Sequence, residues 1–139
     1  MTNQPSNVRV AVVQAASVIM DREASTEKAI SLTQQAAEKG ANIIVFPEAF
    51  IPAYPRGLTF GTTVGSRSPE GRKDWLRYWE NSVAVPSETT ELLGEAARKA
   101  GAYLVIGVVE RDNEFSRGTL YCSVLFFGPD GTLLGKHRK

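Results

Sequence analysis

The sequence of 139 residues predicts an α/β fold with a mostly parallel sheet. Apolar, β-branched runs recur at 42–46 and 102–109, and segments with helical spacing of apolar residues precede each of them. Strand, helix and strand in that order form a right-handed unit with two parallel strands. The turn sequence Gly-Pro-Asp-Gly at 128–131 separates two further apolar segments, which predicts a hairpin at one side of the sheet.

The N-terminal third of the chain predicts the first strand and the first helix. Residues 8–14 are β-branched and bounded by polar residues, as in a strand. Asp21 or Ser25 can cap a helix that runs to about Lys39, because both residue types accept a hydrogen bond from the first helical turn. Gly40 follows as a left-handed helix stop.

The middle of the chain predicts a long irregular segment and two helices. Residues 51–71 are rich in Pro and Gly, and loops of this length are usually functional or disordered. Their aromatic and apolar residues favour packing. Residues 69–81 predict a helix with an aromatic face, which we interpret as core or a subunit contact rather than a ligand site. Ser87 can cap a third helix, 88–100, which Gly101 ends.

The strands at 42–46 and 102–109 are apolar at nearly every position, which predicts burial on both faces of the sheet. Residues 119–127 predict a further strand, and 132–134 a short one that closes the hairpin. Three helices are few for covering two faces. A partner, or chain that is absent here, is therefore expected to cover the rest.

Composition excludes several classes of protein. Sixteen basic and fifteen acidic residues leave a net charge of +1, so nothing points to nucleic acid or to an anionic membrane surface. Cys122 is the only cysteine, which excludes an internal disulfide and fits a reducing compartment. Residues 1–7 are polar, lack the apolar core of a signal peptide and are expected to be flexible. We therefore expect a soluble cytoplasmic chain.

Glu48 is the strongest candidate for acid–base chemistry. Pro47 ends the strand at 42–46, and Glu48 follows at the carboxyl edge, where open α/β sheets bind ligands. A carboxylate in apolar surroundings is expected to have a raised pKa, which suits a general base or acid. Position alone leaves open that Glu48 caps a turn or pairs with Arg56.

The sequence gives little support for a cysteine or serine nucleophile, a metal site or a phosphate-binding loop. Cys122 shares its strand face with apolar residues and is expected to be a small buried hydrophobe rather than a nucleophile. His137 has no acidic or thiol partner at metal-ligand spacing, so no metal site is expected. The glycines match no phosphate-binding loop, and the serines lack a nucleophile elbow. Glu48 and the basic residues 136–139 remain.

Four short motifs follow one another along the chain: Val-Phe-Pro-Glu-Ala-Phe at 45–50, Tyr-Pro-Arg-Gly at 54–57, Leu-Tyr-Cys at 120–122 and Gly-Lys-His-Arg-Lys at 135–139. With them, residues 8–139 resemble the N-terminal part of a nitrilase of the carbon–nitrogen hydrolase superfamily. The second and fourth motifs and an insertion at 69–83 make the chain more similar to nitrilases than to amidases or ureidopropionases.

The resemblance implies that these residues form the N-terminal part of a four-layer αββα sandwich, a mostly parallel sheet with helices on one face. The complete fold pairs into dimers or longer spirals and needs no cofactor. The resemblance also implies a Glu-Lys-Cys triad. Glu48 matches its general base, and Lys139 matches the lysine that stabilises the tetrahedral intermediate, with Lys136 a weaker match. Tyr54 matches a pocket-lining tyrosine. The nucleophilic cysteine and a second glutamate belong to a later segment, and nothing here matches them.

The expected function is therefore hydrolysis of a small-molecule nitrile to a carboxylic acid and ammonia. The chain as given carries only two of the three triad residues, so by itself it is expected to be inactive. Two alternatives stay open: an amidase or cyanide-hydrating relative, and a non-catalytic half-domain that binds a partner chain.

Overall fold

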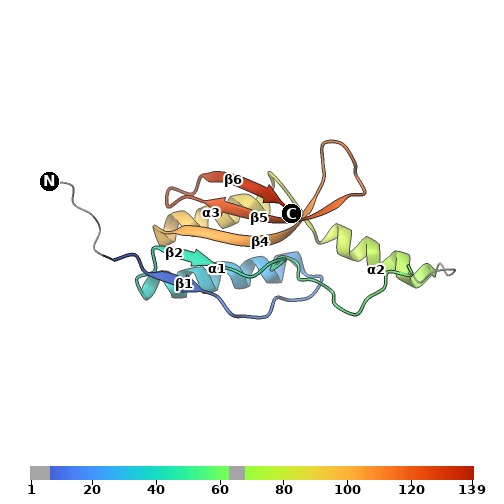
Figure 1. Ribbon diagram of the computed structural model, residues 1–139, viewed down its shortest axis with the longest axis horizontal. Coiled ribbons are helices and arrows are strands. Elements are labelled where there is room, and N and C mark those ends of the chain that lie inside the picture. Colours follow the sequence, from blue (N-terminus) through green and yellow to red (C-terminus); the bar gives the residue numbers. More distant parts are fainter. Residues whose placement is uncertain (1–6, 63–67) are drawn as a thin grey trace.

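The computed structural model describes residues 7–62 and 68–139. These residues form a six-stranded sheet in the order β1-β2-β4-β5-β6, with β3 paired to β4 (Figure 1). The strands are β1 (Val10–Val12), β2 (Ile43–Val45), β3 (Val83–Ala84), β4 (Tyr103–Arg111), β5 (Leu120–Phe127) and β6 (Leu133–Arg138). The helices in this part of the chain are α1 (Arg22–Glu38), α2 (Pro69–Glu80) and α3 (Glu88–Ala100).

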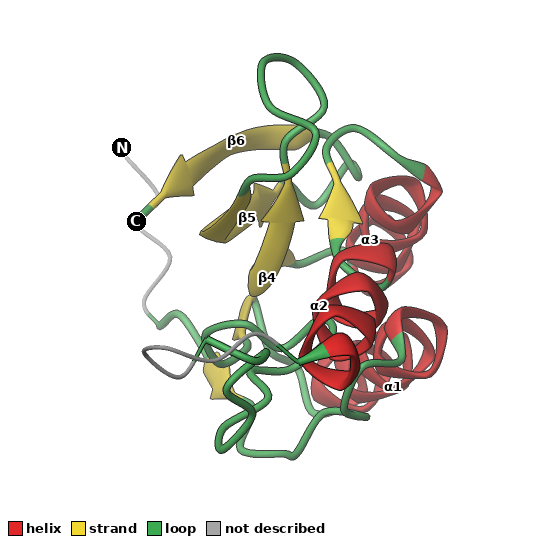
Figure 2. Cartoon of the chain, turned by 90° about the vertical axis from the view of Figure 1, so that its right-hand side faces the viewer, coloured by secondary structure: helices red, strands yellow, loops and turns green. Residues whose placement is uncertain are grey.

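The predicted α/β fold with helices on one face is confirmed. The pairs β1–β2, β2–β4 and β3–β4 are parallel, and β4–β5 and β5–β6 are antiparallel. Helices α1 and α3 lie side by side against one face of the sheet (Figure 2), and α2 projects beyond the end of the sheet (Figure 1). The mixed sheet thus ends in the predicted hairpin.

Local sequence signals account for the helix ends. The Asp21 side chain accepts a hydrogen bond from the Ala24 backbone N–H at 2.9 Å, so Asp21 and not Ser25 caps α1. Ser25 is buried and instead donates to the Val18 carbonyl. Gly101 ends α3 with φ of +59°, a left-handed conformation that glycine adopts without a Cβ clash.

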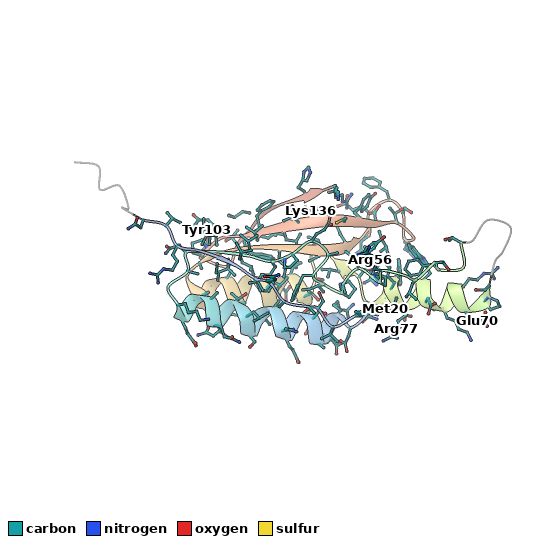
Figure 3. The ribbon with its side chains drawn as sticks, turned by 60° about the horizontal axis from the view of Figure 1, so that its bottom comes forward. Met20, Arg56, Glu70, Arg77, Tyr103 and Lys136 are labelled. Carbon is teal, nitrogen blue, oxygen red and sulfur yellow. The ribbon has the colours of Figure 1, made fainter. Side chains whose placement is uncertain are left out.

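Within the described residues the helices cover one face of the sheet, and cover of the other face by a partner or by absent chain stays a prediction. Ile44, Leu104 and Ile106 are fully buried against the helices. Several side chains on the other face are exposed, Val12 by 78% and Tyr103, which Figure 3 labels, by 48%. An apolar run shows that a strand lies deep in a fold, but not that both covering layers belong to the same segment.

Two strands differ from the prediction. β6 continues to Arg138 rather than ending at residue 134, because it stays paired with β5 as far as Ser123. β3 has two residues, too few for a periodic signal, and was not predicted. The predicted irregular segment at 51–71 is partly described, since residues 63–67 lie outside the described ranges, as do residues 1–6. Within those ranges, no helix is long and apolar enough to cross a membrane.

Candidate functional site

Glu48 lies on a three-residue arch, residues 47–49, that follows β2. The backbone bonds to β4 on both sides of this arch. The Phe46 N–H donates to the Val105 carbonyl at 2.8 Å, and the Phe50 N–H donates to the Gly107 carbonyl at 2.8 Å. Residues 47–49 stand out between these two bonds. Pro47 has no N–H to donate, and Ala49 adopts a left-handed φ of +50°. The arch therefore presents Glu48 at the edge where the parallel strands end.

Gly107 makes room for the arch. A Cβ at this position would clash with the Pro47 carbonyl oxygen and would lie 2.6 Å from the Glu48 Cα. Both are backbone atoms and cannot rotate away. The position of Glu48 therefore depends on the missing side chain of a residue on the neighbouring strand.

Gly107→Ala is expected to lower the free energy of unfolding by about 1–3 kcal/mol, as for overpacking elsewhere. Gly135→Ala is the matched control, because it also adds a methyl group to a strand but has no atom within 4 Å of the new Cβ. Chemical denaturation of both variants measures the difference. Equal stabilities would show that the arch is not held against β4.

The Glu48 carboxylate accepts hydrogen bonds from two side chains that lie far from it in the sequence, Lys139 and Cys122. The Lys139 ammonium donates to Oε1 at 2.8 Å, and the Cys122 thiol donates to the same oxygen at 3.3 Å. The Lys139 backbone N–H also donates to the Cys122 carbonyl at 2.9 Å. The end of β6 and the middle of β5 thus bring both groups to the arch. The Glu48 and Lys139 side chains remain 64% and 75% exposed.

The expected rise in the Glu48 pKa is wrong. The hydrogen bond from Lys139 lowers this pKa most, and the bond from Cys122 lowers it further. Burial acts in the opposite direction and is the weakest influence, because this side chain is open to solvent. Glu48 also raises the pKa of Lys139, so the pair is held as carboxylate and ammonium. In the described structure Glu48 forms its ion pair with Lys139 and none with the alternative partner Arg56.

The expectation that Cys122 is a buried hydrophobe is also wrong. It is only partly buried and lies on the open face of β5, whereas Ser123, Leu125 and Phe127 face the helices. Burial raises the pKa of the Cys122 thiol most, and the bond to Glu48 and its negative charge raise it further. The thiol therefore stays protonated and serves as a donor to Glu48.

These three residues lie in an open pocket of about 580 Å³. Tyr54 lines it too, with its side chain 73% exposed. Only part of the aromatic face of α2 packs in a core as expected: Tyr78 is buried and stacks on Phe60 with ring centroids 5.6 Å apart, and Trp75, which meets Phe60 edge-on, stays 39% exposed. This cluster also forms an apolar wall of the pocket, which the sequence reasoning did not foresee. Burial, the largest influence, raises the pKa of Tyr78 to about 12.

The other candidates lie away from this pocket. Lys136, the weaker match to the lysine of the triad, forms an ion pair with Glu110 instead. His137 pairs in register with Val124 on β5. In residues 7–62 and 68–139, no group of three or more His, Cys, Asp and Glu side chains is placed to hold a metal ion. Acid–base and electrostatic chemistry is what the assembled groups can support.

Comparisons with known proteins bear on this arrangement. The family model for carbon–nitrogen hydrolases matches residues 9–139. The chain is 55% identical over 131 residues to an aliphatic nitrilase of Sinorhizobium fredii, covering 94% of this chain and 41% of that protein. It is 47% identical to a bifunctional nitrilase/nitrile hydratase of Lupinus angustifolius, covering 99% and 38%. The chain thus spans about two fifths of the length of these curated relatives.

Solved structures show the same fold at lower identity. An amidase from Nesterenkonia sp. AN1, in complex with acrylamide, superposes with a TM-score of 0.65 at 17% identity, covering all of this chain and 45% of that one. A carbon–nitrogen hydrolase from Helicobacter pylori gives a TM-score of 0.63 at 23% identity, covering 95% and 39%. The described sheet and helices are therefore a fragment of the αββα sandwich found in these structures.

Proposed function

The chain belongs to the carbon–nitrogen hydrolase family, and from this premise we propose that it supplies the general base and the cationic lysine of a nitrilase active site. The complete enzyme would hydrolyse a small-molecule nitrile to a carboxylic acid and ammonia. The observation that carries the proposal is the contact of Glu48 with Lys139 at 2.8 Å, across 91 positions of sequence, at the rim of a partly apolar pocket. Nitrilase relatives at 46–55% identity support the substrate class.

In the proposed reaction a thiol from outside these 139 residues loses its proton to Glu48 and attacks the nitrile carbon. The nitrogen of the thioimidate takes this proton from Glu48, which is then free to act as the base when water adds. Lys139 stabilises the charge of the tetrahedral intermediate. Ammonia leaves, and a second water hydrolyses the thioester to release the acid. Tyr54 and the α2 aromatics would line the pocket for the substrate's carbon chain.

Cys122 is a second possible nucleophile, since its sulfur lies 3.3 Å from Glu48. We assign it the role of hydrogen-bond donor to the base, because a thiol with a raised pKa is a poor source of thiolate. Cys122→Ala separates the two roles. If Cys122 only donates, most turnover survives; if it is the nucleophile, turnover and active-site labelling by a thiol reagent both disappear.

The test of function uses the longest natural polypeptide that contains this sequence. It is incubated with an aliphatic nitrile, benzonitrile, cyanide and a simple amide, and ammonia and acid are quantified. We expect ammonia and acid from a nitrile, and no ammonia from the 139-residue chain alone. Turnover of the amide only would indicate an amidase, and formamide from cyanide a cyanide-hydrating enzyme. No turnover with any of them would favour a non-catalytic half-domain.

We further propose that residues 8–139 are the N-terminal part of one hydrolase domain. The open face of the sheet, with Val10, Val12 and Tyr103 about half exposed or more, fits coverage by a second sheet. The complete protein is proposed to assemble into homo-oligomers.

A further inference from the structure

A buried carboxylate, Glu110, joins three neighbouring strands behind the pocket. Its side chain is 1% exposed. It accepts hydrogen bonds from Ser123 Oγ of β5 at 2.6 Å and from Arg138 Nη2 of β6 at 2.7 Å, and Lys136 of β6 forms a second ion pair with it. Burial, the largest single influence, raises the Glu110 pKa, but the bonds from its three partners together lower it to about 2. Glu110 is therefore a fixed negative charge.

This cluster lies directly behind the Glu48 site. Side chains alternate between the two faces of a strand, and residues paired in register share a face. Ser123 and Arg138 are register partners. Ser123 follows Cys122 and Arg138 precedes Lys139, so the cluster and the pocket groups occupy opposite faces of the same strand segments. A shift of Arg138 along β6 would therefore move Lys139.

Backbone pairing with β5 continues along β6 as far as Arg138. β6 is an edge strand of the described sheet and pairs only with β5, and this pairing has an irregularity near Phe127, at the opposite end from Arg138. At its C-terminal end the Lys139 N–H bonds to β5, and the Arg138 guanidinium stacks over the Tyr121 ring at 4.1 Å. Arg138 reaches Glu110 through two of its nitrogens, a fork that fixes direction as well as distance.

Stability alone does not account for the cluster. Replacing a buried ion pair by apolar residues of similar size is often neutral or stabilising, because desolvation of the charges offsets their attraction. The best-attested use of buried polar groups is to fix register. Glu110 contacts side chains on both β5 and β6, as a register device requires.

We propose that Glu110 is a positioning residue that fixes the register of β6 and so directs the Lys139 ammonium to Glu48. The inference rests on the proposed function only for its catalytic readout, since the position of Lys139 can be measured without substrate. Glu110 touches neither Glu48 nor the pocket and takes no part in the chemistry.

The test compares Glu110→Gln with Glu95→Gln in the longest natural polypeptide that contains this sequence. Glu95 is the matched control, because it also pairs with an Arg and a Lys but on the exposed surface of α3, away from the site. The first readout is the rate at which an amine reagent acylates Lys139, normalised to Lys28 by mass spectrometry. The second is kcat and KM on the preferred nitrile.

In the Glu110→Gln variant we expect the amine reagent to acylate Lys139 several-fold faster than in wild type, because an ammonium released from Glu48 loses its proton more easily. We expect kcat to fall by roughly 10- to 100-fold with KM nearly unchanged, as for a misplacement of about 1 Å. Glu95→Gln should match wild type in both readouts. If Glu110→Gln does not fold, Arg138→Lys, which keeps the charge but loses the fork, is expected to give the same two changes in milder form.

Acylation of Lys139 at the wild-type rate in the folded Glu110→Gln variant would overturn the proposal, even if kcat fell. The fall in kcat would then not come from a displaced Lys139. Faster acylation in a polypeptide that hydrolyses no nitrile would support the positioning role and reject the proposed function. The two conclusions are thus separable.

Discussion

Glu48→Gln is expected to lower kcat on a nitrile by roughly 10²- to 10⁴-fold in the complete enzyme, the range for loss of a general base. The amide is nearly isosteric, and its oxygen can still accept bonds from Lys139 and Cys122, which wild-type Glu48 receives at 2.8 and 3.3 Å. It cannot take a proton at neutral pH. Ammonia release under saturating substrate measures the effect, and circular dichroism confirms that the fold is kept.

The pH profile adds a second check on Glu48. Its folded pKa lies below the ordinary value, so the base stays ionised, and kcat/KM should hold, to a lower pH than for a free glutamate. Cys122→Ala removes one of the bonds that lower this pKa, so the acid limb should move to higher pH while Glu48 is still present. For the Glu48→Gln variant itself, a kcat above one tenth of the wild-type value would contradict the role of Glu48 as the base.

The local parts of the fold were predictable from the sequence. Helix ends depend on chemistry that acts within one turn: of the two predicted caps of α1, Asp21 and Ser25, the structure selects Asp21, and the predicted end of α3 at Gly101 is confirmed. Pro47 marked the end of β2 in the same way. Each of these signals depends on residues a few positions apart, so no knowledge of distant strands was needed.

The errors arose where a distant segment decides the environment. Period-two alternation places Cys122 and Ser123 on opposite faces but does not say which face the helices cover. The pKa of Glu48 was expected to rise with apolar neighbours in sequence, whereas its neighbours in space are an ammonium and a thiol. The arch over Gly107 likewise depends on β4, which follows more than fifty positions later.

Lys139→Met is the prediction that separates the proposed reaction from a structural ion pair. Methionine keeps an unbranched side chain that lacks the terminal ammonium, so no charge faces the tetrahedral intermediate and kcat should fall by roughly 10²- to 10³-fold. The control is Lys99→Met, since Lys99 also forms an exposed pair with a glutamate, on α3. Exposed pairs contribute little to stability, so neither variant should lose its fold.

The exposed pairs Lys139–Glu48 and Lys99–Glu95 differ in their surroundings. Lys139 and Glu48 line a pocket together with Tyr54, whereas Lys99 does not line this pocket. If Lys139 serves the reaction, losing it should also raise the pKa of Glu48, whose largest lowering contact is Lys139, and move the acid limb of kcat/KM to higher pH. The double variant with Glu48→Gln should lose far less than the product of the two single losses, because both groups act on the same steps. A kcat of Lys139→Met within threefold of that of Lys99→Met, together with an unchanged acid limb of kcat/KM, would show that the pair of Lys139 and Glu48 is only a surface contact. The proposed nitrilase site would then be wrong.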